Sequence, residues 1–216
     1  MNEITIIQAI AIYILPVIFA VTVHEAAHGF VANYYGDKTA KMLGRLTLNP
    51  IKHIDPIGTI IVPLLLITMH ASFLFGWAKP VPVTARNLKN PRRDLAIISL
   101  AGPLSNLLMA IIWAAIAKLA LVLPLKSFNQ PLYLMGMAGI TINFILMLLN
   151  LLPLPPLDGS KILNNFLRGK AAIFYDKVEQ YGFFILILLL LTGILNFILA
   201  PLFSYCFLLI RFIFQI

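Results

Sequence analysis

The sequence predicts an all-α polytopic membrane protein. Hydrophobic residues make up 61% of the 216 residues and charged residues only 11%, whereas a soluble domain has about 25% charged residues. The mean hydropathy is +0.95, and the apolar residues are gathered into long stretches. We expect one membrane-embedded domain over residues 1–216, with about five transmembrane helices, a re-entrant or partly inserted segment and a small membrane-surface β-element.

Six apolar stretches define the expected elements. They are residues 4–35, 57–75, 93–123, 132–152, 180–199 and 201–216. A helix needs about 20 apolar residues to cross a bilayer. The first, third, fourth and fifth stretches meet that length, and the last is short. The second is marginal, with Pro63 in its middle and His70 near its end, so its length does not decide whether it crosses the bilayer.

The basic residues between the stretches indicate the path of 57–75. The loops on either side of 57–75, together with the loop after 132–152, hold 13 of the 16 lysines and arginines. Cytoplasmic loops are enriched in these residues. If 57–75 dips in and returns, all of these charges lie on one side, so we expect a re-entrant segment. We attribute the net charge of +8 to orientation in the lipid bilayer, and we expect no nucleic-acid partner.

The two basic loops around 57–75 also carry a strand-like pattern. Residues 41–50 (KMLGRLTLNP) and 78–86 (AKPVPVTAR) contain short alternations with β-branched residues, which are typical of strands. Pro80 and Pro82 lack an N–H, which suits an edge strand and no central one. The alternatives are a small sheet at the cytoplasmic membrane surface and an ordinary extended loop.

The segment VTVHEAAHGF, residues 21–30, places two histidines and a glutamate inside the first apolar stretch. On a helix His24 and His28 share a face, so both imidazoles can hold one ion, and Glu25 can reach a water bound to that ion. This is the HExxH pattern of zinc metalloproteases, in which the glutamate is the general base. Histidine packing and proton or ion transport are the alternatives. A charge in the bilayer centre costs at least ~2.5 kcal/mol, so this dense cluster favours a metal.

Asp158 is the candidate for a third ligand, since catalytic zinc takes three protein ligands and one water. It follows NLLPLPP, residues 150–156, in which three prolines in four positions break the helix. Irregular backbone at membrane depth is tolerated where it lines a cavity. The alternative role of Asp158 is the N-cap of the short helix after it. With 57–75 re-entrant, two crossings separate the histidines from Asp158, so all three lie on one side.

Three motifs lie in or beside these stretches: HEAAH (24–28), AGPLSN (101–106) and NLLPLPPLDG (150–159). Together they resemble the site-2 protease family of intramembrane zinc metalloproteases, over a core of about 17–168. GRLTLNPIKHIDPIGT (44–59) and GWAKPVPV (76–83) are similar to the compact bacterial members. We expect neither the PDZ domain nor the nucleotide-binding pair of other members. Residues of about 180–216 would form C-terminal helices outside the catalytic core.

The resemblance implies a role for each candidate residue. His24, His28 and Asp158 would bind one Zn²⁺, and Glu25 would be the general base. Asn150 matches a family position that helps to hold the substrate carbonyl or its oxyanion. A hydrogen bond between helices is the alternative for Asn150.

The resemblance also implies the function. The protein would be a zinc-dependent endopeptidase that cuts in or near transmembrane segments, on the cytoplasmic side of a bacterial inner membrane. Its substrates would be single-pass membrane proteins, and we hypothesise that they add as a strand to the KPVPV edge (79–83). An inactive relative that binds membrane helices is one alternative. A metal or proton transporter is another, although it would be expected to have repeated halves. The oligomeric state is not indicated.

The remaining polar residues receive structural roles. We assign close helix packing to the small residues of AGPLSN, namely Gly102, Pro103, Ser105 and Asn106. His53 and His70 match no ligand role. We expect His53 and Asp55 to be solvated near the membrane interface, with a second metal contact as the alternative.

Overall fold

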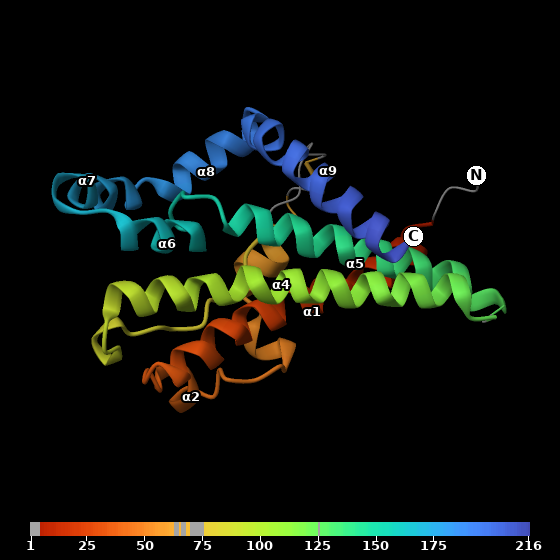
Figure 1. Ribbon diagram of the computed structural model, residues 1–216, viewed down its shortest axis with the longest axis horizontal. Helices are drawn as coiled ribbons and strands as arrows, with labels where there is room; N and C mark the ends of the chain where they lie inside the picture. The colour runs from red at the N-terminus through yellow and green to blue at the C-terminus, as the bar shows by residue number, and fades with distance from the viewer. Residues whose placement is uncertain (1–4, 63–64, 66–67, 70–75, 125) are drawn as a thin grey trace.

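Helices account for all of the regular structure in the computed structural model, which describes residues 5–62, 65, 68–69, 76–124 and 126–216 (Figure 1). Four of them are long and apolar enough to cross a membrane: α1 (Ile6–Tyr34), α4 (Pro91–Val122), α5 (Asn129–Asn150) and α9 (Ile194–Phe214). The shorter helices are α2 (Thr39–Met42), η1 (Pro50–His53), η2 (Pro56–Ile61), η3 (Ala85–Asn87), η4 (Lys126–Phe128), α6 (Asp158–Phe166), α7 (Gly169–Glu179) and α8 (Gly182–Leu191). The predicted all-α polytopic membrane fold is confirmed.

The C-terminal stretches are divided differently from our prediction. We placed a boundary at residue 200, next to Pro201, but Pro201 lies inside α9 and the helices part at Gly193. Gly193 has a φ of 73°, a left-handed conformation that ends a helix and that glycine adopts without strain. The ten-residue α8 is too short to cross a bilayer by itself. The described residues therefore contain four full-length helices, whereas we expected about five.

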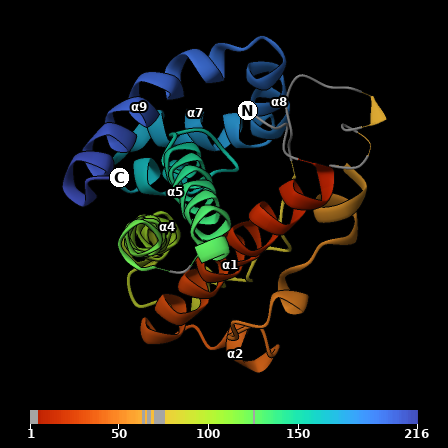
Figure 2. The same cartoon turned by 90° about the vertical axis from the view of Figure 1, so that its right-hand side faces the viewer.

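Helices α1, α4 and α5 form the centre of the bundle, and α9 packs against α4 and α5 (Figure 2). Small residues allow the central helices to approach closely. A Cβ added at Gly136 of α5 would lie 2.8 Å from the Cβ of Ala117 on α4. Gly139, one turn further along, packs directly against the ring of Trp113. Close backbone approach of this kind is the usual basis of helix association in lipid, where the hydrophobic effect does not drive it.

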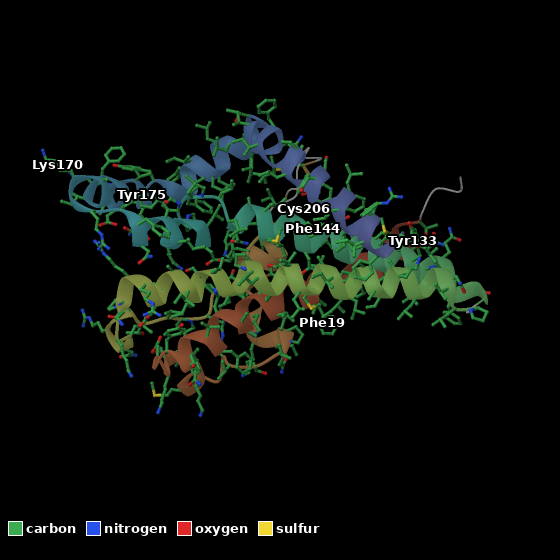
Figure 3. All side chains as sticks on the ribbon, in the orientation of Figure 1. Phe19, Tyr133, Phe144, Lys170, Tyr175 and Cys206 are labelled. Carbon is green, nitrogen blue, oxygen red and sulfur yellow. The ribbon has the colours of Figure 1, made fainter. Side chains whose placement is uncertain are left out.

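The apolar core of the bundle lies between α4, α5 and α9. Its buried members are Ala110, Trp113, Ala114, Ile140, Phe144, Met147 and Ile210. Phe144 of α5 meets Phe203 of α9 edge to face, with ring centroids 6.5 Å apart, and Cys206 packs against the same cluster (Figure 3). Many apolar side chains outside this core are exposed, among them Phe197 and Phe212. Such exposure is expected for surfaces that face lipid.

The two ends of the second apolar stretch meet. The N–H of Trp77 donates to the carbonyl of Gly58 at 3.1 Å, and the hydroxyl of Thr59 donates to the carbonyl of Trp77 at 2.9 Å. The chain therefore leaves and re-joins the bundle at one place. Most of the intervening segment, with His70, lies outside the described residues, so its re-entrant path stays a prediction.

The predicted β-element is absent from the described residues. Residues 41–50 form the end of α2, turns and the start of η1, while residues 76–84 run as an extended segment with no paired strand. Pro80 and Pro82 have no N–H, so Val81 offers the only donor among these three residues. That N–H donates to Glu25 rather than to a neighbouring strand. The alternative of an extended loop therefore describes 76–84.

Asp37, which lies just after α1, forms hydrogen bonds with the C-terminal end of this extended segment. Its buried carboxylate accepts the Thr84 N–H at 2.6 Å and the Asn87 side-chain amide at 2.7 Å. It also accepts the N–H and the hydroxyl of Thr39. Burial by itself raises the pKa of the Asp37 carboxyl, but these hydrogen bonds hold the pKa below its ordinary value of 3.8.

Replacing Asp37 with asparagine is expected to lower the free energy of unfolding by about 1–3 kcal/mol near neutral pH, because an amide nitrogen faces a buried donor. The depressed pKa means that the wild-type stabilisation is complete above the unfolded-state pKa and is lost as pH falls through the folded-state value. The difference between the two proteins should therefore shrink below about pH 4. Denaturant unfolding in detergent at several pH values measures it. The exposed Asp176→Asn is the control, and a difference that does not depend on pH would contradict this account.

Candidate metal centre

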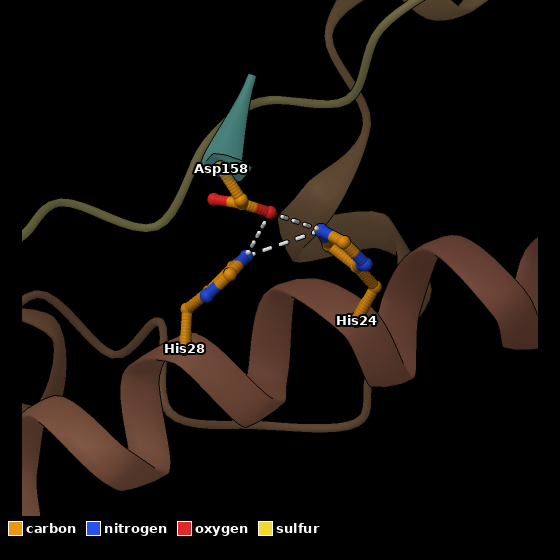
Figure 4. Close-up of side chains that lie close together, drawn as sticks. All are labelled: His24, His28 and Asp158. Atoms are coloured by element: carbon orange, nitrogen blue, oxygen red, sulfur yellow. Dashed lines mark hydrogen bonds and ion pairs between the residues drawn. The ribbon is translucent and has the colours of Figure 1, made fainter. Parts of the chain in front are cut away.

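Three ionisable side chains from two distant parts of the chain converge in the bundle (Figure 4). Nε2 of His24 and Nε2 of His28 each lie 3.2 Å from Oδ2 of Asp158. The two Nε2 atoms are 3.1 Å apart. None of the three residues is more than 9% exposed. Helix α1 supplies both imidazoles because positions i and i+4 share a face, and the first residue of α6 supplies the carboxylate.

Each imidazole is held from behind by a hydrogen-bond acceptor. Nδ1 of His24 lies 2.6 Å from Oδ1 of Asn106, and Nδ1 of His28 lies 2.7 Å from the carbonyl of Ile98. An acceptor at Nδ1 requires the ring proton there, so both Nε2 atoms turn a lone pair toward Asp158. Such outer contacts fix the tautomer and orientation of metal-binding histidines.

Asn106 belongs to a chain of buried amides that joins the three central helices. Its Nδ2 donates to the carbonyl of Ala20 on α1 at 3.2 Å and to Oδ1 of Asn143 on α5 at 2.9 Å. Asn143 in turn donates to the carbonyl of Gly139 at 2.8 Å. The orientation of His24 is thus coupled to the packing of α1, α4 and α5. We predicted only a packing role for Asn106, and its contact with His24 was not predicted.

Gly102 leaves the space in which the imidazole ends lie. A Cβ at this position would be 2.5 Å from Nε2 of His28 and 2.6 Å from Nε2 of His24. At such distances the Cβ or the two rings would have to shift. The packing role that we predicted for Gly102 is therefore a close contact with the two imidazoles themselves, as well as with a neighbouring helix.

The donor set fits zinc. Both imidazoles are held with the ring proton on Nδ1, which leaves Nε2 free to act as a metal ligand. Two nitrogen lone pairs and a carboxylate oxygen within 3.2 Å of each other repel unless a cation lies among them. Two histidines and one carboxylate are a known ligand set of catalytic zinc, which keeps its fourth position open.

Glu25 lies beside this group on the same turn of α1. It is half-buried, and its Oε2 accepts the N–H of Val81 at 2.8 Å. A cavity of about 160 Å³ opens here. Its lining includes all five site residues predicted from the sequence, namely His24, Glu25, His28, Asn150 and Asp158, and also Val81, Ser99 and Lys161.

Asn150 reaches the cavity from the last turn of α5. Its Nδ2 donates to the carbonyl of Leu146 in the same helix at 2.9 Å. This bond lies within α5, so it is not the contact between helices that we weighed as the alternative role. The position of Asn150 on the cavity wall is compatible with a contact to substrate.

The proline-rich loop that carries Asp158 is supported by the C-terminal helices. Leu157 forms a buried cluster with Leu186 of α8 and Leu195 of α9. Tyr175 of α7 donates its hydroxyl to the carbonyl of Pro153 at 2.9 Å (Figure 3). The N-cap position of α6 is occupied by Leu157, so the alternative role of Asp158 as N-cap is wrong. The carboxylate instead contacts the imidazoles.

His53 and Asp55 lie away from this group. His53 is only 2% exposed and contacts the carbonyl of Thr47 through Nε2 at 2.9 Å, so the prediction that it is solvated was wrong. The extended segment lies against η1 here, since the Lys79 N–H donates to the His53 carbonyl at 2.9 Å, and the local sequence does not indicate this long-range contact. Asp55 caps η2 by accepting the N–H groups of Ile57 and Gly58.

Comparison with known proteins indicates a family of peptidases. A model of peptidase family M50 matches residues 124–193, which include Asn150 and Asp158. The chain is 39% identical over 191 residues to "Putative zinc metalloprotease YwhC" of Bacillus subtilis, covering 87% of this chain and 84% of that protein. It is 30% identical over 183 residues to "Putative zinc metalloprotease Rip2" of Mycolicibacterium smegmatis, covering 83% and 66%. No solved structure gives a significant match.

Proposed function

The chain belongs to peptidase family M50, the site-2 protease family, and is a zinc metalloendopeptidase with a membrane-embedded fold, and we propose that it cuts peptide bonds in or near transmembrane segments of other membrane proteins. The observation that carries this proposal is the convergence of His24, His28 and Asp158, with Glu25 beside them, on one cavity. The cavity lies within a bundle whose outer surface is apolar. A substrate segment that lies in lipid could reach it from the side.

We assign His24, His28 and Asp158 as the zinc ligands. Zinc, when bound, supplies Lewis-acid chemistry that lowers the pKa of water to near 7 and polarises a peptide carbonyl. Glu25 takes the proton from the attacking water and passes it to the leaving amine. The Nδ2 group of Asn150 can donate to the oxygen of the scissile carbonyl as negative charge develops there. The Val81 N–H keeps the Glu25 carboxylate oriented toward the cavity.

The basic residues support an active site toward the cytoplasm of a bacterial cell. The loops that hold 13 of the 16 lysines and arginines connect to α2, α6 and α7, which gather at one end of the bundle, while the C-terminus lies at the other end (Figure 1). Asp158 begins α6 at the charged end. The positive-inside rule then orients the metal centre toward the cytoplasmic half of the inner membrane.

A single-pass test substrate can examine this proposal in reconstituted vesicles. The substrate carries glycines in the cytoplasmic half of its transmembrane segment, and the control substrate has leucines there, because cleavage requires a locally extended backbone. We expect cleavage of the first substrate within or beside its segment, located by mass spectrometry. Chelation by 1,10-phenanthroline should stop cleavage and added zinc should restore it. Cleavage confined to soluble parts of the substrate, or unaffected by the chelator, would contradict the proposal.

A further inference from the structure

Arg45 is a buried cation without a carboxylate partner in the described part of the chain. The side chain follows α2, is 8% exposed, and none of the ion pairs found among described residues includes it. A buried charge is costly unless strong polar contacts compensate for it. The contacts that Arg45 does make therefore indicate why a cation lies here.

The guanidinium group contacts the backbone of the extended segment that crosses the cavity. Its Nη2 donates to the carbonyl of Lys79 at 2.8 Å and to the carbonyl of Pro80 at 3.4 Å. The N–H of Lys79 donates in turn to the carbonyl of His53 at 2.9 Å. Residues 79 and 80 are thus held on both sides by the loop of residues 45–53.

One peptide group connects Arg45 to Glu25. The carbonyl of Pro80 and the N–H of Val81 belong to the same peptide unit, whose oxygen faces Arg45 and whose N–H donates to Oε2 of Glu25 at 2.8 Å. The cation of Arg45 lies at the negative end of the peptide dipole and the anion of Glu25 at its positive end, so both charges interact favourably with it. Hydrogen bonds in series polarise and strengthen one another in this way.

The neighbouring prolines make this arrangement specific. Pro80 and Pro82 have no N–H and fix their own φ angles, so a shift of the segment by one residue would offer Glu25 no donor. The position of Val81 along the cavity therefore decides whether the Glu25 carboxylate receives a hydrogen bond from the backbone. Arg45 and the His53 carbonyl are the contacts that fix that position.

We propose that Arg45 is a positioning residue for Glu25 and acts through the Pro80–Val81 peptide group. The inference rests on the proposed role of Glu25 as general base. Arg45 does not line the cavity, so it would not touch the scissile peptide and would act on the proton-transfer step only through Glu25. The loss of Arg45 should therefore affect kcat more than KM.

The test compares Arg45→Gln and Arg45→Lys with Arg86→Gln, a control at an exposed arginine in η3. Each variant is reconstituted with the glycine-containing single-pass substrate, and kcat, KM, zinc content and the thermal unfolding midpoint are measured. We expect Arg45→Gln to lower kcat by roughly 10–100-fold, as for loss of charged hydrogen bonds, with KM within about twofold and zinc retained. Arg45→Lys should recover part of kcat, because an ammonium can still reach one carbonyl.

Each other outcome has a defined meaning. If both Arg45 variants cleave like wild type while Glu25→Gln is inactive, the inference is overturned and the proposed function stands. If Glu25→Gln cleaves normally, the role of Glu25 itself fails. If Arg45→Lys loses zinc or thermal stability together with kcat, Arg45 serves the fold as a whole and the inference is again overturned.

Discussion

Replacing Glu25 with glutamine is expected to reduce kcat by roughly 10²–10⁴-fold, the usual contribution of a general base, while zinc stays bound. Glutamine has the same size, and its carbonyl oxygen can still accept the Val81 N–H that Oε2 accepts now. It has no basic lone pair with which to take a proton from water. Because the three proposed ligands are unchanged, zinc content should equal that of wild type. Cleavage rates and metal analysis of the detergent-purified proteins measure both quantities.

The matched control for this substitution is Glu179→Gln. Glu179 lies on α7 and is exposed, so the same change of charge occurs away from the cavity. We expect the control to cleave at the wild-type rate. Loss of zinc from Glu25→Gln would mean that Glu25 supports the metal and is not only a base. Comparable losses in both variants would point to a general effect of charge.

The candidate metal centre could be proposed from the sequence because its signals are local. The four-residue spacing of His24 and His28 becomes one helix face by helical geometry alone. The prolines before Asp158 mark broken backbone wherever they occur. Only the meeting of these parts required a long-range argument, which counted membrane crossings, and the structure brings the three side chains within hydrogen-bonding distance.

The residues around the centre could not be predicted in the same way. Asn106 reaches His24, and Asn143 reaches Asn106, only because α1, α4 and α5 pack in one particular rotation, which the sequence of a single helix does not specify. The signal available was an amide inside each of two apolar stretches, where an unpaired polar group is costly. The contacts of Arg45 could not be predicted for another reason. Its partners are backbone carbonyls, which every residue has.

Two features differ from the predicted fold. The described residues contain no strand, and the C-terminal helices part at Gly193. The alternation in residues 41–50 and 78–86 suggested strands, but strands form only where a partner supplies complementary donors and acceptors, and here the single donor of Val81 goes to Glu25. We divided the last two stretches at residue 200, but Pro201 lies inside α9, because a proline in a membrane helix removes only one backbone bond and can be accommodated. Gly193, with its positive φ, was the actual end.

Replacing Gly102 with alanine is expected to prevent zinc binding and therefore cleavage. The new Cβ would lie 2.5 Å from Nε2 of His28 and 2.6 Å from Nε2 of His24. The rings cannot withdraw easily, because Asn106 and the Ile98 carbonyl hold their opposite nitrogens. We expect zinc affinity to fall by more than the roughly 10–100-fold that outer-shell changes cause. Zinc content after dialysis against buffered free zinc measures this loss.

Gly136→Ala separates this effect from a loss of helix packing. Its Cβ would also be too close to a neighbour, 2.8 Å from Ala117, but at an α4–α5 contact that involves neither imidazole. We expect Gly136→Ala to lower the thermal unfolding midpoint and to keep its zinc, and Gly102→Ala to lose zinc while its size-exclusion profile stays that of the folded protein. Zinc retained at wild-type affinity by folded Gly102→Ala would show that the imidazoles do not meet at this glycine. The assignment of His24 and His28 as joint ligands would then fail, because the space into which both Nε2 atoms point is the space that Gly102 leaves open.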